Sequence, residues 1–203
     1  RSMAAIRVGM IGGDLHALYY GAQMFDHDPL HLRSVGRGYA AAFYHYTHYN
    51  DPRIMTVPFV GGFELAKVWA AERDDAEVMV SVFGGEVCDS FEQCSDDVDL
   101  AFIPDCNGDG SNHLELASPG LEKRAPTFCD KPFAYEYRDA CALVELAEQT
   151  GTPLMSLSIL REVPQGGHFQ SRLAEIAPVG FACIKGGGTT MPGHIHAISL
   201  AQS

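Results

Sequence analysis

The chain has 203 residues and a formal net charge of −12, and 46% of its residues are hydrophobic while 20% are charged. These proportions are typical of a globular protein, and the acidic balance argues against nucleic acid or an anionic membrane as the partner. No hydrophobic run approaches the roughly 20 residues needed to cross a bilayer, so we expect no transmembrane helix, and we expect no signal peptide.

The cysteines indicate the redox compartment. No two of them form a C-x-x-C pair, and most lie inside hydrophobic runs; they are Cys88, Cys94, Cys106, Cys129, Cys141 and Cys183. This pattern predicts small buried side chains with free thiols. Free thiols are typical of a reducing compartment, so we expect a cytoplasmic protein.

The beginning of the chain predicts a strand, a tight turn and a helix. Residues 7–11 form a short hydrophobic run that ends at Gly12 and Gly13, and residues 14–25 follow with helical hydrophobic spacing. This order opens a βαβ unit. A helix that begins in such a turn presents free N–H groups and the positive end of its dipole, which suit a diphosphate.

The turn matches the dinucleotide-binding fingerprint G-x-G-x-x-G/A in part. With Gly12 at the first position, Asp14 stands at the second and Ala17 at the third. An ordinary strand-to-helix turn is the alternative. We expect the Asp14 side chain to be turned away from the diphosphate. The residues expected to bind that group are Gly12, Gly13, Asp14, Leu15 and His16.

Residues 27–62 have no clean hydrophobic period and contain several prolines and glycines. We therefore expect an insertion between the first helix and the second strand. Its tyrosines and histidines at residues 43–49 suit a sugar contact or a subunit contact, and a packed surface loop remains the alternative.

The second strand, expected at residues 63–69, precedes a helix at residues 74–83. An acidic residue just after this strand binds the ribose hydroxyls in dinucleotide folds. Glu72 is the first carboxylate there, and the adjacent Arg73 could equally bind a 2′-phosphate. The choice between NAD and NADP therefore stays open.

The rest of the chain alternates between the two kinds of element. We expect strands at residues 86–89, 98–104, 126–129 and 153–157, a short helix capped by Ser90, and helices that end at Leu121 and at Gly151. Alternation with short links predicts an α/β fold, a doubly wound parallel sheet of the Rossmann type. Ligands of this architecture bind at the carboxyl ends of the strands.

Two loops at that edge supply further candidates for cofactor binding. The loop after the fourth strand contains Pro104, Asp105, Asn107 and His113, and the loop after the fifth contains Asp130, Lys131 and Pro132. The ammonium group of Lys131, partly removed from water at a strand end, can hydrogen-bond to an alcohol oxygen and take part in proton transfer.

Several motifs together resemble the Gfo/Idh/MocA family over residues 5–202. They are the opening V-G-M-I-G turn, the loop to His113, Asp130-Lys131-Pro132, the Gly-Thr-Pro strand and Ser158-Ile159-Leu160-Arg161. The resemblance implies an oxidoreductase that uses NAD or NADP on a sugar or polyol, with Lys131 in the active site. The family motif is E-K-P, so Asp130 replaces a glutamate.

The resemblance also implies two domains. Residues 1–158 would bind NAD(P), and residues 159–203 would begin an α+β substrate domain that mediates homo-oligomer formation. Its first strand would be residues 179–188, and the helix at residues 194–201 would carry the catalytic His196. We therefore expect a C-terminally truncated piece of a longer protein.

Two alternatives to a carbohydrate oxidoreductase stay open. Pro192 stands where many family members have an aspartate, and together with Asp14 and the early stop it favours a nucleotide-binding module without turnover. Cleavage of a glycoside with the help of NAD would use the same cofactor site. His194 and His196 have no acidic third ligand, so we expect no metal.

Overall fold

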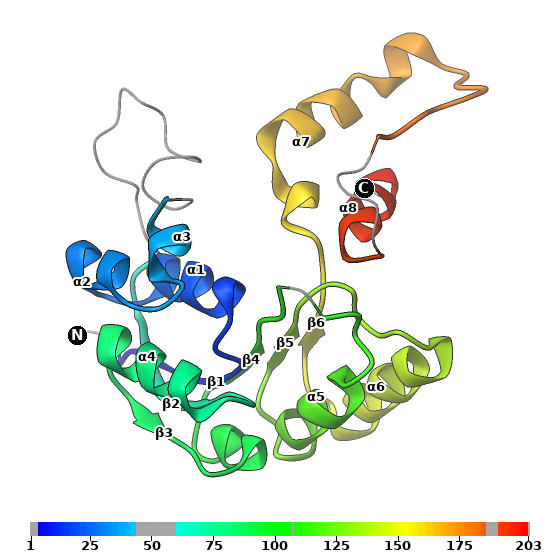
Figure 1. The fold of residues 1–203 in the computed structure, drawn as a ribbon. Coiled ribbons are helices and arrows are strands. Elements are labelled where there is room, and N and C mark those ends of the chain that lie inside the picture. Colours follow the sequence, from blue (N-terminus) through cyan, green and yellow to red (C-terminus); the bar gives the residue numbers. More distant parts are fainter. Residues whose placement is uncertain (1–3, 44–59, 107, 186–190, 203) are drawn as a thin grey trace.

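The computed structural model describes residues 4–43, 60–106, 108–185 and 191–202, and its core is a six-stranded parallel sheet in the order β3-β2-β1-β4-β5-β6 (Figure 1). The strands are β1 (Ile6–Ile11), β2 (Phe63–Trp69), β3 (Glu86–Val87), β4 (Leu100–Ile103), β5 (Thr127–Cys129) and β6 (Leu154–Met155). The chain winds outward from β1 to β3 and then returns to β4, so the order reverses between β1 and β4. The predicted doubly wound sheet is confirmed.

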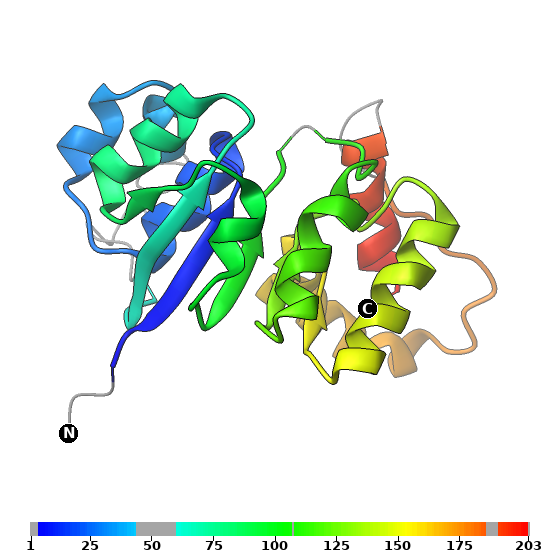
Figure 2. The ribbon, with the colours of Figure 1, turned by 90° about the horizontal axis from the view of Figure 1, so that it is seen from below.

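Helices cover the two faces of the sheet. Met10 and Phe102 belong to a core with α1 (Leu15–Met24) and α4 (Arg73–Phe83). Their neighbours Ile11 and Ile103 belong to a second core with α5 (His113–Glu122) and α6 (Tyr137–Thr150). Figure 2 shows α5 and α6 in green and yellow-green, beside each other and apart from α1 and α4. Burial on both faces explains why the strands are continuous hydrophobic runs.

At two positions the backbone adopts a conformation with positive φ that favours glycine. Gly12 has a φ of 143°, and a Cβ atom there would lie 2.7 Å from the carbonyl oxygen of Pro104. The chain can therefore pass this close to the end of β4 only with glycine. Gly151 ends α6 in the left-handed conformation, as its position after the periodic segment predicts.

The expected insertion contains two short helices that the sequence pattern did not indicate. They are α2 (Pro29–Ser34) and α3 (Gly38–Phe43). The start of α2 has a clear local cause, because Asp28 accepts a hydrogen bond from the N–H of Leu30 and Pro29 occupies the first turn. The rest of the insertion through residue 59, including most of the aromatic and histidine cluster, lies outside the described residues.

The C-terminal part is mostly helical. It contains η3 (Ile159–Glu162), α7 (Pro164–Ser171), η4 (Leu173–Ile176) and α8 (Met191–Ala201), and Figure 1 shows α7 standing away from the sheet. The helix predicted at residues 194–201 is confirmed within α8. The strand predicted at residues 179–188 is wrong over residues 179–185, which form no strand, and the remainder lies outside the described residues. A hydrophobic run becomes a strand only where a partner strand satisfies its backbone groups.

The short helix and the free cysteines predicted from the sequence are present in the structure. The helix after Ser90 is the 3-10 helix η2 (Phe91–Ser95). All six cysteines are free, as predicted, but Cys183 is exposed, and Cys106 and Cys141 are half-buried. Within the parts of the chain that the structure describes, no helix is both long enough and apolar enough to cross a membrane.

Leu143 on α6 tests the second core. Its side chain is fully buried, whereas the neighbouring Val144 is 45% exposed. Leu143→Ala should lower the free energy of unfolding by about 2–5 kcal/mol because it leaves a cavity, while Val144→Ala should change it by less than about 0.5 kcal/mol. Chemical denaturation measures both, and equal losses would contradict this packing.

Candidate active site

Asp14 joins the start of α1 to the loop after β4. Its Oδ1 accepts hydrogen bonds from the N–H groups of His16 at 2.8 Å and Ala17 at 3.2 Å. Its Oδ2 accepts one from the N–H of Cys106 at 2.5 Å. Burial raises the pKa of Asp14 above its ordinary value. The expectation that this side chain is turned away is therefore corrected, since the carboxylate lies over the first turn of the helix as an N-cap.

Part of the anion-binding capacity of this turn nevertheless remains. Among the described residues, no acceptor bonds to the N–H groups of Gly13, Asp14 or Leu15. These three donors precede the two that the Asp14 carboxylate occupies. An anion at the start of α1 can therefore still bind to the backbone, but beside a carboxylate that repels it.

Asp130 is the centre of a hydrogen-bond network between three segments. Its Oδ2 accepts from His16 Nδ1 at 2.5 Å and from the N–H of Asp105 at 3.2 Å. Its Oδ1 accepts from the N–H of Lys131 at 2.7 Å. Burial lowers the pKa of His16, but Asp130 and the neighbouring Cys106 together outweigh it and raise this pKa to about 9. His16 is therefore an imidazolium at neutral pH.

Lys131 and His196 come together at the same edge. Lys131 is only 5% exposed, and its Nζ donates to the carbonyl oxygen of Cys106 at 3.2 Å. His196, on α8, forms a hydrogen bond between Nδ1 and Ser158 Oγ at 2.6 Å. Burial lowers the pKa of His196, and the nearby charge of Lys131 lowers it further. The structure thus places an ammonium and a neutral imidazole within electrostatic range of each other.

Asp105 and His113 shape the loop after β4. His113 is fully buried and bonds through Nε2 to Asp105 Oδ2 at 3.1 Å and through Nδ1 to the carbonyl oxygen of Phe133 at 3.2 Å. Although burial lowers the pKa of His113, Asp105 and Cys129 together raise it to about 10. Asp105 also accepts from the N–H of Gly108 at 2.6 Å. The pair therefore holds the loop after β4 in place.

The remaining predicted cofactor residues lie in different surroundings. Pro104 and Pro132 are buried, and Asn107 lies outside the described residues. Glu72 precedes α4, is exposed, and makes no side-chain hydrogen bond with any described residue. Arg73 is paired with Glu77 and with Asp89, each at 3.2 Å. Glu72 is therefore the more available of the two neighbours.

Two residues of the site were not among the predicted ones. Ser158 orients His196 through the bond described above, and it belongs to the Ser-Ile-Leu-Arg motif, which offered a signal. Cys106 lies between Asp14 and Lys131, because its N–H donates to Asp14 and its carbonyl oxygen accepts from Lys131. Its position in the loop after β4 was the available signal, but it does not show these contacts.

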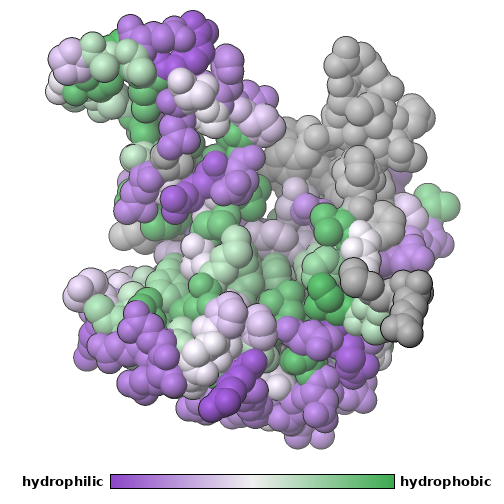
Figure 3. All heavy atoms as spheres, turned by 180° about the vertical axis from the view of Figure 1, so that it is seen from behind, coloured by the Kyte–Doolittle hydropathy of each residue, from purple (hydrophilic) through white to green (hydrophobic). Residues whose placement is uncertain are grey.

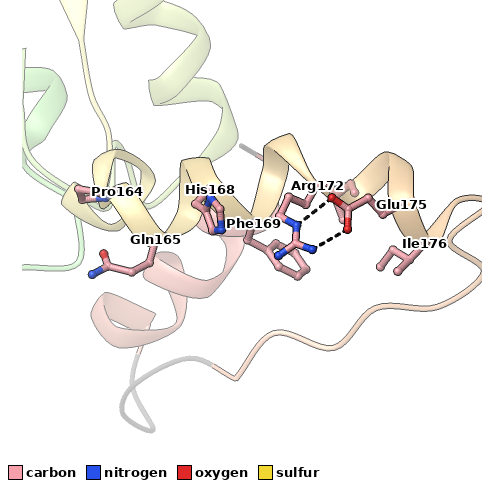
Figure 4. Close-up of a pocket in the computed structure, with 8 residues that line it drawn as sticks. Pro164, Gln165, His168, Phe169, Arg172, Glu175 and Ile176 are labelled. Atoms are coloured by element: carbon pink, nitrogen blue, oxygen red, sulfur yellow. Dashed lines mark hydrogen bonds and ion pairs between the residues drawn. The ribbon is translucent and has the colours of Figure 1, made fainter.

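Two hollows among the described residues lie away from Lys131 and His196. One of about 540 Å³ runs along α7 and η4, where Arg172 is paired with Glu175 (Figure 4). Another of about 520 Å³ lies between α1 and β4, β5 and β6 and is almost wholly apolar. Figure 3, a view from behind, shows hydrophobic residues gathered in the middle of that face. Within the described residues, no group of three or more His, Cys, Asp or Glu side chains could hold a metal ion.

Comparisons with known proteins agree with this architecture. Residues 6–157 match the model of the Gfo/Idh/MocA family, described as an oxidoreductase family with an NAD-binding Rossmann fold. A search of curated protein sequences found no match.

Similar solved structures come from several organisms. They include KijD10, a 3-ketoreductase from Actinomadura kijaniata with NADP (21% identity, TM-score 0.57), biliverdin reductase from Synechocystis with biliverdin and NADP+ (17%, 0.57) and an oxidoreductase from Thermotoga maritima (19%, 0.57). Each alignment covers 84% of this chain and 43–44% of the other. The chain therefore spans less than half the length of these proteins, and the likeness shows the fold.

The ion pair between His16 and Asp130 can be tested by titration. In the folded protein the ring protons of His16 should titrate near pH 9, as followed by NMR. Asp130→Asn should lower this pKa, because burial then acts without the carboxylate. Since the folded pKa is raised, the pair stabilises the protein fully below pH 6.5, and this contribution is lost as the pH rises through 9. An unchanged pKa in the variant would contradict the pairing.

Proposed function

Because the chain belongs to the Gfo/Idh/MocA family of oxidoreductases with an NAD-binding Rossmann fold, we propose that it transfers a hydride between NAD or NADP and a hydroxyl group of a sugar, a polyol or a related carbohydrate. The supporting observation is that Lys131, from the loop after β5, lies within electrostatic range of His196 from α8. The pair lies at the carboxyl edge of the sheet, where ligands of open parallel sheets bind.

The residues present fit a dinucleotide. The free N–H groups of Gly13, Asp14 and Leu15 would donate to the diphosphate, and Glu72 would accept hydrogen bonds from the ribose hydroxyls. The nicotinamide ring, when bound, supplies the hydride acceptor or donor. In this proposal residues 1–158 hold the cofactor, and residues 159–203 contribute the second wall of the site.

Lys131 and His196 have complementary roles in the proposed reaction. The Lys131 ammonium would donate a hydrogen bond to the substrate oxygen and stabilise its developing negative charge. His196 would accept the hydroxyl proton at Nε2, because Nδ1 is held by Ser158. Its lowered pKa keeps the imidazole in the neutral, proton-accepting form near pH 7. General base catalysis of this kind contributes roughly 10²–10⁴-fold to a rate.

A second function, nucleotide binding without turnover, is favoured by one observation. The Asp14 carboxylate occupies two of the N–H groups that open α1, where a glycine normally lets the backbone approach the diphosphate. A weakened cofactor site would bind nucleotides without supporting efficient catalysis. Turnover measured with a panel of sugars and polyols separates the two functions.

Lys131→Met tests the reaction directly. The substitution keeps the length of the side chain but removes the charge, so turnover of sugars or polyols should fall by about 10²-fold or more, while affinity for NADH stays within about twofold. Lys123→Met, at the C-cap of α5, is the matched control and should leave both values unchanged. A Lys131→Met protein with full turnover would refute the mechanism.

Glu72→Ala tests the cofactor preference. Loss of a charged hydrogen bond costs about 1.5–3 kcal/mol, so the Kd for NADH should rise by about 10-fold or more while the Kd for NADPH changes less. Asp74→Ala, on the first turn of the same helix, is the control for general charge effects. Fluorescence titration measures all four values. If Glu72→Ala keeps the discrimination of the wild-type protein, Glu72 does not bind the ribose.

A further inference from the structure

A groove lies on the face of the sheet beside α1. It has a volume of about 520 Å³ and extends from α1 over β4, β5 and β6. Two of the rings that line it, those of Phe102 and Phe128, are stacked with their centroids 4.4 Å apart, and Tyr20 packs edge-on against both. Met155 and Ile159, which also line it, are 52% and 38% exposed. We call this hollow the sheet groove.

The sheet groove carries no charge. Among the described residues that line it none is charged, and the polar ones are Tyr20, Gln23 and Thr127. An exposed apolar surface that is hollowed and spans several elements is typical of a binding site. Because an unpaired charge is costly to bury, the occupant of this groove has to be largely apolar and free of unpaired charge.

The C-terminal part of the chain presents an apolar stripe of matching character. Phe169, Leu173 and Ile176 follow one another at intervals of four and three residues along α7 and η4, so they lie on one face. They are 66%, 36% and 62% exposed, and all three line the hollow along this segment (Figure 4). We call these residues the α7 stripe. Amphipathic helices anchor in apolar grooves through this spacing of i, i+4 and i+7.

The charges beside the α7 stripe neutralise each other. Arg172 donates from Nε and Nη2 to the two carboxylate oxygens of Glu175, at 2.8 and 2.7 Å (Figure 4). A two-pronged pair of this kind has no net charge and satisfies both partners. The helical segment can therefore enter an uncharged groove without leaving a charge unpaired, which is the electrostatic match that the sheet groove requires.

Contacts within the chain keep α7 away from its own groove. η3 directly precedes α7, and Ser158 at the start of η3 is bonded to His196 on α8 at 2.6 Å. A Cβ atom at Gly166 on α7 would lie 3.5 Å from the side chain of Leu200, also on α8. Figure 1 accordingly shows α7 standing away from the sheet. In this position the α7 stripe can meet the groove of a second molecule without any rearrangement of its own chain.

We propose that two copies of this chain form a dimer in which each inserts its α7 stripe into the sheet groove of the other. This reciprocal arrangement has two-fold symmetry and closes on itself, so it gives a dimer and not a filament. A stable interface buries about 1,200–2,000 Å² in total. Because the exchange forms the same contact twice, each contact has to supply only half of this area. The two surfaces include neither Lys131 nor His196, so the inference stands independently of the proposed function.

Size-exclusion chromatography with light scattering measures the mass of the chain in solution. The wild-type chain should be a dimer at about 50 μM. Phe169→Asp should raise the Kd of the dimer at least about tenfold, because it places a charge in an uncharged groove. Tyr137→Asp is the matched control and should keep the wild-type Kd, because Tyr137 is 85% exposed on α6 and lines neither surface. A monomeric wild-type chain, or an unchanged Kd for Phe169→Asp, would overturn the proposal.

A cross-link distinguishes the exchange from closure of α7 onto its own groove. Phe169→Cys and Met155→Cys are combined with Cys183→Ser, which removes the exposed native thiol. Treatment with a short bis-maleimide should join positions 155 and 169 of different chains, so mass spectrometry should find this peptide pair in the covalent dimer on a denaturing gel. If the pair is found only in the monomer band, α7 closes onto its own chain and the proposal is wrong.

Discussion

The buried carboxylate of Asp130 is the group on which the carboxyl edge of the sheet depends. A buried charge is tolerated only when it is paired and fully hydrogen-bonded. Asp130 meets this requirement with the imidazole of His16 and the N–H groups of Asp105 and Lys131. The same bonds join the start of α1 to the loops after β4 and β5. The position of Lys131 and the charge of His16 are therefore both consequences of one carboxylate.

Asp14 is the second carboxylate at this edge, and its effects oppose each other. As an N-cap it stabilises α1, and its bond to Cys106 holds the loop after β4 against the helix. As a negative charge beside the free N–H groups of Gly13 and Leu15, it weakens the attraction for a diphosphate. A glycine at this position would reverse both effects. Asp14 therefore makes the turn more rigid and at the same time makes it less favourable for a diphosphate.

The sheet could be predicted from the sequence because each strand is a hydrophobic run bounded by glycine, proline or a helical period. The turn at Gly12 could also be predicted, because it lies between a hydrophobic run and a segment with helical spacing. The hydrogen bond from the N–H of Cys106 to Asp14 could not, because it depends on how the loop after β4 folds over the sheet edge. Residues 179–185 were wrongly predicted as a strand, since hydrophobic residues such as Phe181 show the tendency but not the presence of a partner. The orientation of Asp14 was not predicted, because the sequence analysis assigned the first N–H groups of α1 to a diphosphate. In the structure the Asp14 carboxylate accepts hydrogen bonds from two of these groups instead.

The charges of the site suggest how its parts act on one another. His16 and Lys131 are cations, Asp14 and Asp130 are carboxylates, and hydrogen bonds connect their segments at this edge of the sheet. An incoming diphosphate therefore meets a turn that is electrostatically balanced rather than positive, and backbone N–H groups have to supply most of the attraction. Because Asp130 keeps His16 protonated, that balance persists through neutral pH.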